Sequence, residues 1–129
     1  MKEGLLIMHY CEECQKNIVE LHHIVFKSQA AYMKNIEINF KYLCPEHHRG
    51  NNGPHMNKKK NIQYKLELQK KLFELFGDKK YFTDKDIQQR LETTSSEAVK
   101  IVKKLKHYKE GYERIDLVTR LMGGMLYVD

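Results

Sequence analysis

The sequence predicts an α+β fold, in which a small core of short strands and loops precedes a mainly helical extension. All three cysteines and six of the seven histidines lie within residues 9–55, where apolar residues occur only in short runs. After residue 60 the apolar residues recur every three or four positions, which is the spacing of amphipathic helices. We therefore divide the 129 residues into a metal-stabilised core at 1–60 and a helical basic extension at 61–129.

The core is expected to contain short extended segments joined by turns. Leu5–Tyr10 is a short apolar run that predicts a strand, and Cys11–Cys14 predicts a tight knuckle. Ile18–Leu21 and Ile24–Phe26 are β-branched or apolar, and we expect them to form a short hairpin or extended pair. Two glycines and a proline in Arg49–Pro54 predict a loop.

The first long helix is predicted in the second half of the chain. Before it, a loop followed by a helix start is expected around Pro45. Asn61–Phe76 carries a broad apolar face and therefore predicts a helix. A second helix, at about 84–92, is expected after Thr83, because Asp86 stands three residues later in a capping-box arrangement.

Two further helices and a final strand complete the predicted extension. Thr94 and Glu97 repeat the capping-box pattern and open a lysine-rich helix over 95–109. Together with the preceding helix it resembles a helix-turn-helix in outline. Ile115–Met122 is expected to be a short helix, and Met125–Val128 a strand after two glycines.

The formal net charge of +6 is unevenly distributed. Residues 1–55 hold six basic and six acidic side chains, so the whole basic excess lies after residue 55. A basic surface attracts the phosphate backbone of DNA by counterion release, although the same lysines can instead form a solvated surface without a partner. No run approaches the roughly 20 apolar residues that cross a bilayer, so we expect no membrane partner.

The cysteines are predicted to be reduced. Three cysteines cannot form a closed set of disulfides, and the apolar run Leu5–Met8 is too short for a secretory signal. We therefore expect the protein to be cytoplasmic, where its thiols are available as metal ligands.

Four residues predict a structural zinc site. Cys11 and Cys14 form one pair of ligands three positions apart, and Cys44 and His47 form a second. Two such knuckles are a common way of building a tetrahedral Zn²⁺ site. The alternative is three buried thiols that pack as small apolar groups.

The residues between and after these pairs resemble a known motif. Glu-Leu-His-His-Ile-Val at 20–25 and Asn-Phe-Lys-Tyr-Leu-Cys-Pro-Glu-His-His at 39–48 are similar to the HNH, or ββα-metal (His-Me finger), endonuclease motif. The similarity covers roughly residues 10–57. It implies a zinc-stabilised ββα-metal core and hydrolysis of DNA phosphodiester bonds. A small free-standing nuclease of this type resembles a bacteriophage or prophage product, or a homing-type enzyme, and a phage origin would place the protein in the cytoplasm of a bacterial host cell.

The resemblance implies a role for each matching residue. His23 corresponds to the general base that activates water, and Asn39 to the residue that orients it. His22 and His48 correspond to ligands of one catalytic divalent ion. No histidine stands one helical turn after His48, so the third ligand is carried over to His55, with Asn51 or Asn52 as substitutes. His47 replaces the commoner cysteine at the fourth zinc position.

The sequence is compatible with several catalytic ions and with more than one function. Oxygen-rich substrates favour Mg²⁺ or Mn²⁺ as the catalytic ion, whereas histidine ligands also suit Ni²⁺ or Zn²⁺. Contact with DNA is expected from two groups of lysines, which are Lys58, Lys59, Lys60, Lys100, Lys103, Lys104 and Lys106. The rival interpretations are a non-catalytic zinc-containing DNA-binding module and a protein-interaction or inhibitor protein that reuses the fold.

Overall fold

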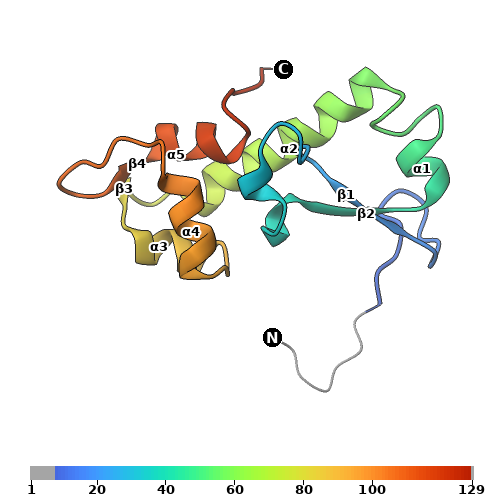
Figure 1. Cartoon of the computed structure of the whole chain (residues 1–129). Coiled ribbons are helices and arrows are strands. Elements are labelled where there is room, and N and C mark those ends of the chain that lie inside the picture. Colours follow the sequence, from blue (N-terminus) through green and yellow to red (C-terminus); the bar gives the residue numbers. More distant parts are fainter. Residues whose placement is uncertain (1–7, 129) are drawn as a thin grey trace.

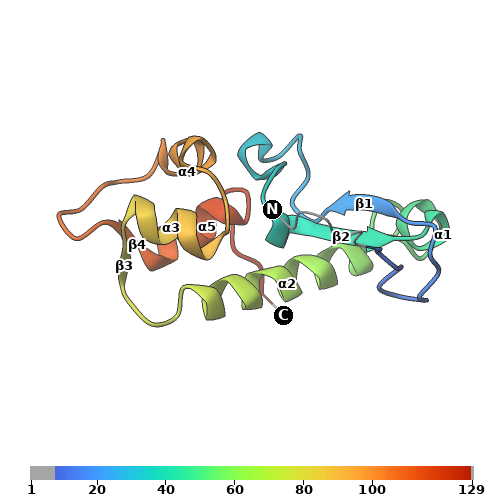
Figure 2. The same cartoon turned by 90° about the horizontal axis from the view of Figure 1, so that it is seen from below.

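A single long helix, α2 (Lys58–Leu75), connects the two halves of the protein (Figures 1 and 2). The computed structural model describes residues 8–128. Asn57 caps α2, because its side-chain oxygen accepts a hydrogen bond of 3.0 Å from the backbone N–H of Lys60. The helix therefore begins three residues before the predicted start, and the predicted domain boundary between residues 60 and 61 falls in its first turn.

The front half contains one antiparallel pair of strands. β1 (Glu20–His23) pairs with β2 (Phe40–Leu43), and His22 lies opposite Lys41. The predicted pairing of Ile18–Leu21 with Ile24–Phe26 is wrong, because the strands that pair are far apart in the sequence. Half of the strand predicted at Leu5–Tyr10 lies outside the described residues, and its described part forms no strand.

The connection between β1 and β2 contains two 3₁₀ turns, η1 (Ala31–Met33) and η2 (Glu37–Asn39). After β2 comes the short helix α1 (Pro45–Arg49), which Cys44 caps through its sulfur. The segment before Pro45 is thus a strand and not the expected loop, whereas the turn that follows α1 agrees with the loop predicted from its glycines.

The rear half contains a second, smaller sheet and three helices. β3 (Tyr81–Phe82) pairs with β4 (Tyr112–Glu113), and α3 (Asp84–Arg90) and α4 (Ser95–Val102) lie between them in the chain. α5 (Arg114–Leu121) follows. Two antiparallel sheets with several helices confirm the predicted α+β class. The capping box of Thr83 and Asp86 is also present as predicted.

The predicted helix over 95–109 is wrong in length, because α4 ends at Val102. Tyr108 and Gly111 instead close a tight turn, in which each backbone N–H donates to the other residue's carbonyl at 2.9 and 3.1 Å. Gly111 has a φ of +130°, and a Cβ there would lie 2.4 Å from the carbonyl oxygen of Phe82. This turn lets β4 approach β3, so the chain leaves the helix early.

The two halves are packed against each other around a continuous set of buried apolar residues. The Tyr32 hydroxyl donates to the carbonyl of Arg120 at 2.6 Å, and the Arg120 guanidinium lies 3.6 Å from the centre of the Tyr32 ring. The strand predicted at Met125–Val128 is wrong, because these residues form an irregular tail. Within residues 8–128, no helix has both the length and the apolar character needed to cross a membrane.

Candidate metal centres

The first cluster consists of the four residues predicted to hold structural zinc. The Cys14 and Cys44 sulfurs are 3.8 Å apart, and Nδ1 of His47 lies 3.2 Å from the Cys44 sulfur and 3.7 Å from that of Cys11. A Zn–S bond of about 2.3 Å in a tetrahedron implies sulfur atoms about 3.8 Å apart. This Cys₃His group can therefore hold a metal ion such as zinc.

The chemistry of the donors also suits a metal. Cys11 and Cys44 are buried, and no disulfide joins the three cysteines. Burial opposes ionisation of Cys11, but backbone N–H groups from the two knuckles donate to its sulfur and lower the pKa of the thiol to about 6. A thiol that ionises this readily is prepared to be a metal ligand, since the thiolate is the binding form.

A polar network attaches this cluster to α2. The hydroxyl of the buried Tyr64 donates to the carboxylate of Glu13, which stands between the two cysteines of the first knuckle. The Lys60 ammonium lies 3.0 Å from the same carboxylate. The hydrogen bond from Tyr64 and the charge of Lys60 both lower the pKa of Glu13. Lys60, one of the predicted DNA contacts, thus has an acidic partner within the protein.

We expect Tyr64→Phe to lower the free energy of unfolding by about 1.5–3 kcal/mol, the usual contribution of a hydrogen bond to a charged group. Tyr32→Phe is the matched control, because the Tyr32 hydroxyl donates to a neutral carbonyl and its loss should cost only about 0.5–1.5 kcal/mol. Urea unfolding of the zinc-loaded proteins measures both values. Equal losses in the two variants would contradict an anchoring role of the Tyr64–Glu13 bond.

The second cluster consists of His22, His48 and His55, whose nearest ring nitrogens all lie within 4.8 Å of one another. These residues come from β1, from α1 and from the turn after α1. Nε2 of His48 and Nε2 of His55 are 3.0 Å apart, and the centre of the His22 ring lies 5.0 Å from each of the other two. The structure thus brings together all three histidines that the sequence predicted as ligands of one ion.

The ring of His22 is 1% exposed, and its Nε2 is a buried polar atom without a hydrogen-bond partner among the described residues. Burial lowers the pKa of His22 to about 3, and the nearby charges of His48 and His55 act in the same direction. The ring is therefore neutral at physiological pH. A buried nitrogen lone pair without a hydrogen bond is costly unless it has another partner, and it fits a metal ion.

Glu20 and Arg49 fix the orientation of His48, and both were missed by the sequence prediction. The Glu20 carboxylate accepts a hydrogen bond of 2.7 Å from Nδ1 of His48, which leaves the Nε2 lone pair facing His55. Arg49 binds both oxygens of the same carboxylate at 3.0 and 2.8 Å and, together with His48, lowers the pKa of Glu20. The sequence did contain one indication of the role of Glu20. It stands two residues before His22, and side chains two positions apart on a strand point to the same side.

The turn between His48 and His55 depends on a glycine. A Cβ at Gly53 would lie 2.5 Å from the carbonyl oxygen of His48 and 2.7 Å from that of His47. These oxygens belong to the backbone, so they cannot move aside as a flexible side chain would. The absence of a side chain at Gly53 therefore lets the turn fold back onto α1 and bring His55 to His48.

His23 lies beside the histidine cluster but is not part of it. Its Nε2 is 2.9 Å from the carbonyl oxygen of Lys34, so this nitrogen carries the proton, and no hydrogen bond within residues 8–128 engages Nδ1. His22, His23, His48 and His55 all line one cleft of about 720 Å³. The ring of His23 is therefore held in one tautomer at the edge of the cleft, with its second nitrogen available.

Asn39 is buried and does not contact His23. Its Oδ1 accepts from the backbone N–H of Val25 at 2.7 Å, and its Nδ2 donates to the carbonyl oxygens of Val25 and Met33 at 3.0 and 3.2 Å. The side chain thus closes the connection that follows β1, starting two residues after His23. Any orienting effect of Asn39 on His23 acts through this backbone.

The remaining predicted DNA contacts lie at the surface in both halves. Lys58 and Lys59 are exposed in the first turn of α2, and Lys100 is exposed on α4, where its ammonium lies 3.4 Å from the carboxylate of Glu97. Lys103, Lys104 and Lys106 are exposed after the end of α4, so they do not form the expected helical face. Their contact with DNA stays a prediction.

Both clusters lie in the front half, and their ligand atoms come from segments that are well separated in the sequence. Glu20 and Tyr64 support them from β1 and α2. No protein-family model, curated protein or solved structure matches the chain, so the chemistry of these two centres has to follow from their own residues.

Proposed function

We propose that the protein is a metal-dependent endonuclease that hydrolyses phosphodiester bonds of DNA, with an HNH-type ββα-metal core. The observation that carries the proposal is the buried Nε2 of His22, which has no hydrogen-bond partner among the described residues and lies in the same cleft as His48 and His55. A structural zinc site alone needs none of these three histidines. Their convergence therefore favours a second, catalytic ion over a purely structural role.

His23 has the properties of a general base in this proposal. Its Nε2–H is donated to the Lys34 carbonyl, so the Nδ1 lone pair can accept a proton from water. The oxygen of that water then forms a bond to phosphorus, and the bond from phosphorus to the 3′ oxygen breaks. The products are a 5′ phosphate and a 3′ hydroxyl, which takes its proton from solvent.

His22, His48 and His55 would hold the divalent ion, and Glu20 would keep His48 in the tautomer that binds it. When bound, such an ion supplies stabilisation of the negative charge on the phosphorane and on the leaving oxygen. Three imidazole ligands would leave room in the coordination of such an ion for phosphate and water. We propose Mg²⁺ or Mn²⁺ in the cell, with Ni²⁺ or Zn²⁺ as alternatives, and Zn²⁺ in the Cys₃His group.

DNA is proposed as the substrate because of the charge distribution. All of the basic excess lies after residue 55, and α2 begins with three consecutive lysines directly after the turn that carries His55. Lysines beside the cleft would contact phosphates without reading base sequence. The lysines of α4 and of the turn after it are proposed as a second region of backbone contact.

We expect the pure protein to convert supercoiled plasmid to nicked or linear DNA with Mg²⁺ or Mn²⁺ and to leave it intact when free divalent ions are removed. Elemental analysis has to show one zinc per chain throughout, because chelation of structural zinc would also abolish activity. Restoration by added Mn²⁺ completes the experiment. Cleavage that is equally fast without divalent ions would refute the proposal, and so would binding of DNA without cleavage with any of the four ions.

A further inference from the structure

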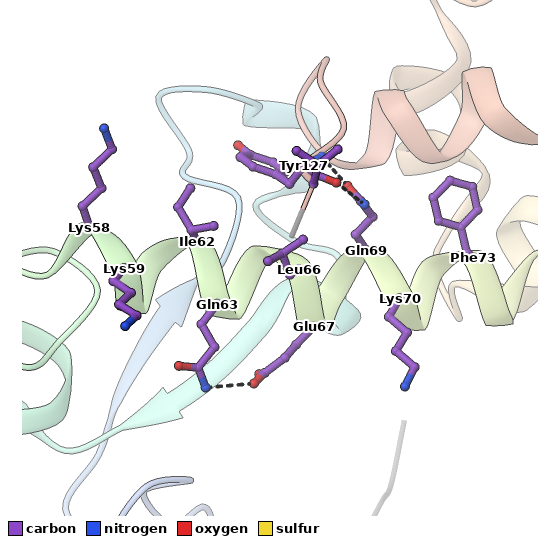
Figure 3. Close-up of a pocket in the computed structure, with 11 residues that line it drawn as sticks. Lys58, Lys59, Ile62, Gln63, Leu66, Glu67, Gln69, Lys70, Phe73 and Tyr127 are labelled. Atoms are coloured by element: carbon purple, nitrogen blue, oxygen red, sulfur yellow. Dashed lines mark hydrogen bonds between the residues drawn. The ribbon is translucent and has the colours of Figure 1, made fainter.

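A groove of about 1090 Å³ lies between α2 and the C-terminal tail. Figure 3 shows its floor, which Ile62, Leu66 and Phe73 form from one side of α2 and Tyr127 from the tail. The tail is fixed in place, because the Gln69 side-chain amide donates to the Tyr127 carbonyl at 2.8 Å and accepts from the Tyr127 N–H at 2.7 Å. The groove is therefore built by specific contacts.

The rim of this groove is positively charged. Lys58, Lys59 and Lys70 line it, and none of the three forms an ion pair within residues 8–128. Glu67 is the only acidic residue among the described residues of the lining, and it lies 3.8 Å from the Lys41 ammonium and accepts a hydrogen bond of 3.2 Å from Gln63. A ligand that suits this groove thus carries negative charges at its edge and apolar or planar groups toward the floor.

The groove adjoins the histidine cleft. The ammonium of the buried Lys65 lies 4.8 Å from the centre of the Phe26 ring and 5.5 Å from that of the Tyr127 ring. Phe26 lines the cleft and stacks on His55, with ring centres 5.3 Å apart, whereas Tyr127 lines the groove. Lys65 therefore lies between an aromatic ring of the cleft and one of the groove.

We propose that this groove binds an unpaired, single-stranded segment of DNA adjacent to the bond that is cut. A duplex keeps its bases stacked inside and would offer the apolar floor nothing to contact. A single strand presents phosphates to the lysines and base faces to the aromatic and aliphatic side chains, which is how single-stranded nucleic acids are commonly bound. The inference rests on the proposed nuclease function for the choice of nucleic acid, and it narrows the substrate to DNA with an unpaired stretch beside the cleavage site.

Binding measured without divalent ions tests this inference separately from cleavage. The probe is a fluorescein-labelled oligothymidylate of 12 residues, compared by fluorescence anisotropy with a labelled duplex of the same length. Leu66→Glu places a negative charge on the groove floor, and the double variant Lys58→Ala/Lys59→Ala removes two rim charges. We expect Leu66→Glu to weaken single-strand binding by at least about tenfold, since stacking on such a platform typically contributes about 5- to 150-fold per base. We expect a loss of about the same size for the lysine double variant, because it removes two contacts to phosphates.

Leu126→Glu is the matched control for the floor, because Leu126 is exposed on the same tail and does not line the groove. Lys80→Ala/Lys85→Ala is the control for charge, since both lysines are exposed in the rear half. Each control should retain single-strand affinity within about twofold. Leu66→Glu should leave duplex affinity nearly unchanged, and thermal unfolding monitored by circular dichroism confirms that the variants fold.

Three results would overturn the inference. They are unchanged single-strand affinity in Leu66→Glu, an equal loss of single-strand and duplex affinity in Leu66→Glu, and displacement of the oligonucleotide by an acidic amphipathic peptide that binds more tightly. The last result would assign the groove to a partner protein. His23→Ala should bind the oligonucleotide as the unaltered protein does. Binding of the oligonucleotide by the unaltered protein without cleavage of DNA under any of the four ions would refute the proposed nuclease and leave the groove assignment standing.

Discussion

Replacement of His23 by alanine is expected to lower the rate of plasmid cleavage by at least about 100-fold, because general base catalysis usually contributes about 10²- to 10⁴-fold. His23 lines the cleft without belonging to the three-histidine cluster, and the expected loss comes from removal of its Nδ1 lone pair. The ring itself is half-buried and contributes one hydrogen bond to the Lys34 carbonyl, so the fold should survive. Time courses on supercoiled plasmid with saturating Mn²⁺ measure the effect.

The control for this variant is His107→Ala, which removes an exposed histidine of the rear half. It should cleave at the unaltered rate. The zinc content of His23→Ala should equal that of the unaltered protein, because neither cluster includes its ring. Its unfolding midpoint should fall only slightly, because the variant loses one hydrogen bond to the neutral Lys34 carbonyl. If His23→Ala cuts plasmid as fast as the His107 control, His23 is not the base.

Replacement of Cys44 by serine is expected to have the largest effect on stability. Its sulfur belongs to the Cys₃His group and also caps α1, where it accepts from the His47 N–H at 3.5 Å. Binding of structural zinc contributes about 10–16 kcal/mol in small zinc domains, which is comparable with the roughly 5–15 kcal/mol that stabilises a whole domain. We therefore expect the variant to lose its zinc and the front half to unfold at room temperature.

Elemental analysis and circular dichroism measure the two consequences of Cys44→Ser. His47→Cys is the matched control, because it converts the group to four cysteines, a set that also holds structural zinc. It should keep one zinc per chain and most of the stability. Unchanged zinc content and unchanged unfolding in Cys44→Ser would show that the cysteine cluster is a packing feature and not a metal site.

Local signals in the sequence predicted the helices well. The capping box of Thr83 and Asp86 and the helical spacing of apolar residues identified α3 and α2, because both signals depend on neighbours within one or two turns. The end of α4 was missed. It is determined by the approach of Gly111 to Phe82, a contact between residues 29 positions apart in the sequence that no local pattern encodes.

The pairing of the front strands was missed for the same reason. The sequence favoured a local hairpin of Ile18–Leu21 with Ile24–Phe26. In the structure, the Asn39 side chain instead hydrogen-bonds to both the backbone N–H and the carbonyl of Val25, so Val25 cannot pair with a neighbouring strand. β1 therefore pairs with β2. This pairing brings Glu20 toward α1, where it meets His48 and Arg49.

The residues of both clusters could be predicted because their chemistry is unusual in type and spacing. Cysteines and a histidine in paired knuckles stand out in any sequence. So do the adjacent His22 and His23, which His48 and His55 follow. Their supporting residues did not. Glu20, Tyr64 and Glu13 are common residue types whose importance arises only from what they contact in the folded chain.

The location of a divalent ion tests the central claim most directly. Crystals of the protein grown with Mn²⁺ and measured for anomalous scattering should contain one manganese bound by His22, His48 and His55, at a site distinct from the zinc of the Cys₃His group. The His23 ring should lie beside that ion without binding it. Three histidine rings that bind no ion at millimolar Mn²⁺, or an ion bound elsewhere on the protein, would contradict the account.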